Sequence, residues 1–93
     1  MGSLISNDKR CVICGDTRYL HRHHIYPGTA NRKKSEEDGC WVWLCPAHHN
    51  MGDSGVHNDK DLDRRLKALC QIEWEETYGS REDFIKRFGR NYI

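Results

Sequence analysis

The chain has 93 residues, the size of one small domain, and 37% hydrophobic with 31% charged residues indicates a globular protein. No apolar run is long enough to cross a membrane, and the N-terminus lacks the basic region and apolar core of a signal peptide. The formal net charge of +1 gives little support to a nucleic-acid partner, although bound divalent cations would add positive charge that this count omits.

Cysteine and histidine are the most informative residue types in the composition, with five and six copies respectively. An odd number of cysteines that includes a Cys-x-x-Cys pair indicates zinc binding in a reducing compartment rather than a set of disulfides. A domain of this size buries few apolar side chains and often gains stability from a metal. We therefore expect a cytoplasmic protein with a zinc-stabilised core.

The first element after a polar N-terminal segment is a zinc knuckle formed by Cys11 and Cys14. Two thiolates separated by two residues bind one zinc ion, and the following Gly15 permits the tight turn. Residues 19–26 then have the aromatic and aliphatic content of a strand, which the Pro-Gly pair at 27–28 ends.

This predicted strand carries three histidines in four positions, His21, His23 and His24. Neutral imidazole is both a common metal ligand and a proton acceptor that works near neutral pH. Adjacent side chains of an extended segment point to opposite faces, whereas a bulge can turn both toward one pocket. His23 and His24 can therefore do different jobs, one on a metal and one on a proton.

Residues 28–39 are interpreted as a loop, in which the basic run at 32–34 either contacts phosphates or is simply solvated. Residues 40–44 are apolar and aromatic, and they predict a second strand. Pro46 suits the first position of the helix that follows.

Cys45 and His48 repeat the two-residue gap of the knuckle. With the two knuckle thiolates they give a Cys₃His set of four ligands, which is the closed coordination of a structural zinc. His49 lies one helical step, about 100°, beyond His48 and should face another pocket, the one at the histidine-rich strand. The reverse assignment of His48 and His49 stays open.

The rest of the chain predicts helices. His57 is either a further ligand or a surface residue. Asn58 or Asp59 caps a helix that runs to about residue 78, whose apolar stripe consists of Leu62, Leu66, Leu69 or Cys70, and Trp74. A capping box at Ser80 to Asp83 begins a last helix over about 81–88, whose apolar residues are Phe84, Ile85 and Phe88. We interpret Cys40 and Cys70 as buried small hydrophobes.

Together these motifs resemble the HNH nuclease family, in the treble-clef zinc form of the ββα-metal fold and in particular its small phage-encoded members. The match is carried by the segments 23–25, 31–34, 44–49 and 55–57 and by the C-terminal Phe-Gly-Arg-Asn-Tyr at 88–92. The resemblance implies an α+β fold over residues 1–93 as a single domain. Its knuckle and ββα core span about 9–57, and its additional helices about 58–93.

The resemblance also implies roles for single residues. His24 would be the general base, and His23, His49 and His57 would bind a catalytic divalent metal, which is Mg²⁺, Mn²⁺, Ni²⁺ or Zn²⁺. The chain departs from the family pattern at His48, where a cysteine is usual. It also has Cys40 where the family's middle asparagine usually lies, so Asn31 is the candidate for the orienting role of that residue.

The implied activity is hydrolysis of DNA phosphodiester bonds, with nicking of one strand, by a phage or prophage protein in the cytoplasm of a bacterial host. The implied partners are DNA and an unidentified packaging or recombination protein, with no membrane. Two alternatives remain, a zinc module that binds nucleic acid without cutting it and a zinc domain whose helices dock a protein. The first explains the four-ligand set but leaves the remaining histidines unused, and the second is permitted by the near-neutral charge and the apolar stripes of the helices.

Overall fold

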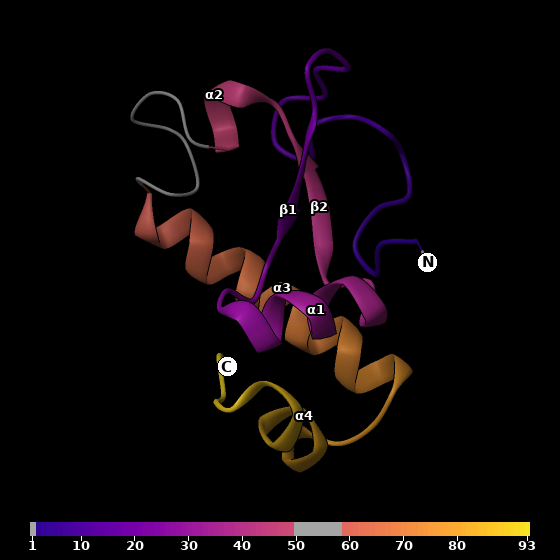
Figure 1. Ribbon diagram of the computed structural model, residues 1–93, viewed down its shortest axis with the longest axis vertical. Helices are drawn as coiled ribbons and strands as arrows, with labels where there is room; N and C mark the ends of the chain where they lie inside the picture. The colour runs from indigo at the N-terminus through magenta and orange to yellow at the C-terminus, as the bar shows by residue number, and fades with distance from the viewer. Residues whose placement is uncertain (1, 50–58) are drawn as a thin grey trace.

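A two-stranded antiparallel sheet lies at the centre of the fold, with helices at both of its ends (Figure 1). The computed structural model describes residues 2–49 and 59–93. Strand β1 (His21–His24) pairs with β2 (Trp41–Leu44), so that His21 lies opposite Leu44 and His24 opposite Trp41. The observed architecture is α+β, as predicted, and the order of its first elements is β1, α1, β2 and α2.

Both strands are shorter than predicted. Tyr19 has a φ of 55° and an exposed fraction of 82%, so the chain turns there and the strand begins two residues later. Beyond β1, the N–H of Ile25 donates to the Cys40 carbonyl at 2.9 Å, which continues the pairing by one step. The side chains of Ile25 and Cys40 are buried, and this pair leads from the sheet into the core.

The prediction of a loop over residues 28–39 was wrong, because helix α1 (Thr29–Asp38) fills this segment. It ends at Gly39, whose φ of 78° is a left-handed conformation that glycine adopts at little cost. The helix was missed because it has no apolar stripe, and its buried residues are the polar Ser35 and Asp38. A helix signal was nevertheless present, since Arg32 and Glu36 have the i, i+4 spacing of opposite charges on one helix face.

Polar contacts with the C-terminal part of the chain hold α1 in place. Asn31 and Lys34 donate hydrogen bonds of 3.0 and 2.7 Å to the last carbonyl groups of α4. The carboxylate of Asp38 accepts a hydrogen bond of 2.9 Å from the indole N–H of Trp74 and forms an ion pair with Arg87. These contacts replace the apolar face by which a surface helix usually packs.

Helix α2 (Pro46–His49) follows β2 directly, and α3 (Lys60–Thr77) is the long helix. Asp59, one of the two predicted caps, is the N-cap of α3, and its carboxylate accepts hydrogen bonds from two backbone N–H groups of the first turn. The buried side of α3 runs through Cys70, whereas Leu69 is 43% exposed. Of the two alternatives left open for the apolar stripe, the structure therefore selects Cys70.

Helix α4 (Arg81–Phe88) begins with the predicted capping box, in which Ser80 and Asp83 bond each other's backbone N–H. It ends at Gly89, whose φ is 90°. Phe84 and Phe88 are buried as predicted, but Ile85 is 38% exposed and was wrongly placed in the apolar face.

The core lies between the sheet end and the two C-terminal helices. Tyr26, two residues after β1, is fully buried against Phe84 and Phe88, and its hydroxyl donates a hydrogen bond of 2.7 Å to the Lys67 carbonyl of α3. Cys70 is fully buried in the same cluster, as predicted. Within the described ranges, no helix is both long and apolar enough for a membrane span.

Candidate metal centre and adjoining pocket

Four residues from three parts of the chain bring thiol and imidazole groups together. Cys11 and Cys14 lie in the turn before β1, Cys45 directly follows β2, and His48 lies in α2. Their ligand atoms all lie within 4.8 Å of one another, and they are the one such group in the described residues. This cluster could hold a metal ion and is compatible with the structural zinc that the sequence predicted.

The spacing of the donor atoms fits zinc. Ligands at the corners of a tetrahedron, with Zn–S bonds of about 2.3 Å and Zn–N bonds of about 2.0–2.1 Å, lie roughly 3.5–3.8 Å apart. The Sγ atoms of Cys14 and Cys45 are 3.7 Å apart. The Nδ1 atom of His48 lies 3.8 Å from the Sγ of Cys11 and 3.3 Å from that of Cys45. Two of these three distances lie within the tetrahedral range and the third, 3.3 Å, lies just below its lower limit, a spacing compatible with a Cys₃His zinc site.

The backbone around the cluster explains why these side chains converge. Gly15 has a φ of 79° and donates to the Cys11 carbonyl at 2.8 Å, which closes the knuckle, while Val12 bonds the Trp43 carbonyl and ties the knuckle to β2. Burial raises the pKa of the Cys11 thiol, but backbone N–H groups, Cys45's first among them, outweigh it and lower this pKa from 9.0 to about 6. The thiolate form that binds metals is thus favoured at neutral pH.

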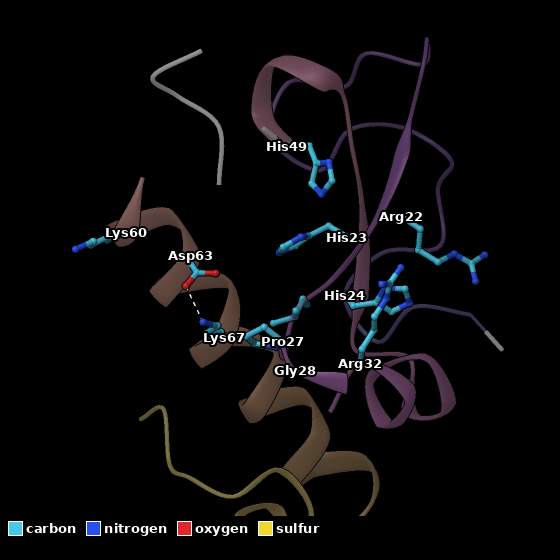
Figure 2. Close-up of a pocket in the computed structure, with 11 residues that line it drawn as sticks. Arg22, His23, His24, Pro27, Gly28, Arg32, His49, Lys60, Asp63 and Lys67 are labelled. Atoms are coloured by element: carbon cyan, nitrogen blue, oxygen red, sulfur yellow. Dashed lines mark hydrogen bonds and ion pairs between the residues drawn. The ribbon is translucent and has the colours of Figure 1, made fainter. Parts of the chain in front are cut away.

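A pocket of about 510 Å³ adjoins this cluster along β1 (Figure 2). Its walls carry three histidines and several cations, namely Arg22, His23, His24, Arg32, His49, Lys60 and Lys67, together with Asp63. His23 and His49 face each other in the close-up, and their ring centroids are 5.4 Å apart. The pocket therefore combines imidazoles from β1 and α2 with positive charge from α1 and α3.

His21 is a neighbour of this pocket that the sequence interpretation left without a role. Its Nδ1 atom lies 2.9 Å from the Nδ1 of His49, close enough for a hydrogen bond. The two-residue period of a strand could have indicated this position of His21. Residues two apart share a face, so His21 lies on the same side of β1 as His23. Together these contacts put the imidazoles of His21, His23 and His49 in one cluster at the end of α2.

His24 points to the opposite side of β1 from His23 but still lines the pocket (Figure 2). Its Nε2 atom lies 2.7 Å from the Oε2 of Glu36 in α1, a residue that the loop interpretation overlooked. The other carboxylate oxygen of Glu36 pairs with Arg22. Partial burial raises the pKa of Glu36, but the hydrogen bond with His24 and the charge of Arg22 together lower it below its usual value.

Two further candidate residues have different positions. The side-chain amide of Asn31 donates to the Phe88 carbonyl at 3.0 Å, so in this structure it links two helices. His57, the fourth histidine expected at the pocket, lies outside the described residues. His23, His24 and His49 are thus the predicted residues that the structure brings to the pocket.

No protein-family model, curated protein or solved structure matches this chain. Any function assigned to it therefore has to follow from the residues of the two sites.

Proposed function

We propose that the chain is a metal-dependent endonuclease of the HNH type, with a treble-clef zinc site and a ββα-metal catalytic site, and that it nicks DNA. The order of elements supports this proposal. A knuckle precedes a strand that bears adjacent histidines, and a second strand leads into a short helix that bears His48 and His49. The zinc cluster would use His48 and leave His49 for the pocket.

The observation that carries the proposal is the pocket itself. His23, His24 and His49 line one pocket although they come from two elements, and two cations in its walls, Arg32 and Lys60, make no ion pair within the described residues. A phosphodiester needs positive charge around its oxygens, a base for the attacking water and ligands for a cation. All three kinds of group occur in this pocket.

His23 and His49 are the described residues that would hold the catalytic divalent cation, and the resemblance adds His57. Imidazole is a suitable donor for the transition metals in the proposed set. When bound, such a cation neutralises the charge that develops on the phosphate oxygens.

The chain's own groups would do the rest. The ring of His24 takes a proton from water, whose oxygen forms a bond to phosphorus while the bond to the 3′ oxygen breaks and that oxygen receives a proton from solvent. Such general base catalysis contributes typically ~10²–10⁴-fold. Arg32 and Lys60 lie where they can bind the phosphate oxygens.

A second pocket of about 570 Å³ extends this basic surface along α3 to the C-terminal segment. The two pockets share Lys60 and the ion-paired Asp63 and Lys67, and the second adds Arg64 and Arg90. Neither added arginine makes an ion pair within the described residues, so both are available to neighbouring phosphates. A polyanion longer than one phosphate, such as DNA, fits this arrangement better than a small anion does.

The test is plasmid nicking by the purified chain with Mg²⁺, Mn²⁺, Ni²⁺ or Zn²⁺, beside the variant His24→Ala. We expect nicking that a chelator abolishes, and a variant that keeps its zinc and its melting temperature but loses activity. Nicking by His24→Ala at the parent rate would show that the base is another group. No nicking by the parent with any of the metals would refute the proposed activity.

One observation favours a second candidate, a zinc module that binds nucleic acid without cutting it. Among the described residues, the Cys₃His cluster is the one group whose ligand atoms converge tightly enough to hold a metal. Metal counting separates the candidates, because the module predicts one tightly bound ion whereas the nuclease predicts a second, exchangeable divalent ion.

A further inference from the structure

Glu36 is the residue on which this inference rests, because its carboxylate bridges two side chains of β1. One oxygen lies 2.7 Å from the Nε2 of His24, and the other pairs with Arg22. Both partners are two residues apart on the strand, so they lie on the same face of β1. The carboxylate of α1 therefore approaches that face and touches the proposed base directly.

The carboxylate is held from both sides. The Arg22 guanidinium lies 4.0 Å from the ring centroid of Trp41 and 5.2 Å from that of Trp43, and this stacking on β2 restrains its position. On the other side, α1 is tied to α4 through the buried Asp38 and its ion pair with Arg87. A glutamate on a free surface loop would lack both restraints.

We infer that Glu36 is a positioning residue for His24, a role that rests on the proposed nuclease function. Its carboxylate accepts a hydrogen bond from the Nε2–H group of the ring, which fixes the ring's rotation and leaves Nδ1 as the nitrogen that takes the proton from water. Within the described residues, Nδ1 of His24 makes no hydrogen bond. The ring becomes an imidazolium when it accepts the proton, and the adjacent carboxylate stabilises that positive charge.

This assignment gives the orienting role to Glu36, whereas the family resemblance suggested Asn31 for it. The Asn31 amide is engaged with the Phe88 carbonyl of α4, whereas Glu36 contacts the His24 ring itself. The orienting function would thus have moved from an amide to a carboxylate. A carboxylate differs from an amide in that it places a negative charge beside the ring.

The test compares Glu36→Gln with the matched control Glu37→Gln, which makes the same change of charge one residue further along α1. The Glu37 side chain is 53% exposed and contacts Arg87 at 3.3 Å, away from the pocket. We expect kcat for plasmid nicking to fall about 10- to 100-fold in Glu36→Gln with KM changed less than about twofold, and neither value to change in the control.

A second measurement detects the contact between His24 and Glu36 and does not depend on nuclease activity. The Nε2 proton of His24 should give a downfield imidazole N–H resonance in the proton NMR spectrum of the parent and of Glu37→Gln. It should move upfield or disappear in Glu36→Gln, because a neutral amide oxygen is the weaker acceptor. Zinc content and melting temperature, measured beside it, show whether the variants keep their fold.

The outcomes are distinct. If the parent nicks DNA and Glu36→Gln does so with the same kcat, or loses activity only in proportion to lost zinc or lost fold, Glu36 does not position the base. An unchanged N–H resonance in Glu36→Gln overturns the contact itself. A parent that nicks no DNA with any metal refutes the proposed function instead, while the resonance still reports on the contact.

Discussion

Removing one ligand of the proposed zinc site should cost the protein most of the stability that a bound metal would give it. Cys11 is 1% exposed, its Sγ lies 3.8 Å from His48, and its turn is bonded to β2. The variant Cys11→Ala removes a thiolate and leaves three ligands, which bind zinc much more weakly than four. The proposed zinc site links the turn that contains Cys11 to β2 and to α2, and this link should then be lost.

The magnitude follows from linkage. Zinc at a thousandfold excess over its Kd stabilises the folded chain by about 4 kcal/mol, provided that it binds only the folded state. For 93 residues the unfolding entropy is roughly 0.2 kcal/mol/K. Zinc should therefore raise the Tm of the parent by about 20 °C over that of the chelated protein.

The assay is thermal unfolding followed by circular dichroism, with zinc and with a chelator, on the parent, on Cys11→Ala and on the control Cys70→Ala. Cys70 is a fully buried cysteine outside the cluster. Its loss should lower the Tm through a cavity but preserve the response to zinc. Equal Tm values for the parent with and without zinc, or an undiminished zinc response in Cys11→Ala, would refute the structural zinc at these ligands.

Three further predictions use other contacts. Asp38→Asn removes the charge from a carboxylate that binds an indole N–H and a guanidinium, and should cost about 2 kcal/mol, or roughly 10 °C in Tm; an unchanged melting curve would contradict it. Arg64→Ala and Arg90→Ala should each reduce the slope of log Kobs against log salt for DNA binding by about 0.9, whatever the DNA sequence, whereas a parental slope would place the phosphates elsewhere. In the cobalt-substituted protein, His48→Cys should raise the thiolate charge-transfer absorbance by about a third, because a fourth thiolate joins three, whereas His49→Cys should leave this absorbance unchanged. The opposite result would mean that His49, and not His48, is the fourth zinc ligand.

What could be predicted from the sequence is what short spacings determine. The Cys-x-x-Cys and Cys-x-x-His spacings each place two ligands within one turn of backbone, which predicts that both pairs bind the same metal ion. The structure brings these four side chains together. The capping box of α4 and the Asp59 cap of α3 are likewise local patterns, and both were confirmed. His23, His24 and His49 were expected at one pocket, and all three line it.

What could not be predicted depends on contacts between distant segments. Helix α1 has no apolar face, so its stability in place comes from polar links to α4 that no local pattern contains. Glu36 was consequently missed, because its meeting with His24 requires α1 to be a helix lying against β1. The exposed faces of Leu69 and Ile85 reflect the same limit, since helical periodicity alone does not decide which of two adjacent residues points inward.

The polar attachment of α1 to α4 has a consequence for the length of chain that the pocket requires. Truncation before Arg81 would spare every ligand of the proposed zinc site and every described histidine of the pocket. It would remove the α4 partners of Asn31, Lys34 and Asp38, and the carboxylate of Asp38 would keep its hydrogen bond from Trp74. The carboxylate of Glu36 would then lie on a helix that has lost its contacts with α4. A shortened chain of this kind would keep the proposed metal ligands but hold the proposed base less firmly, so the proposed activity should require the chain well past the last histidine.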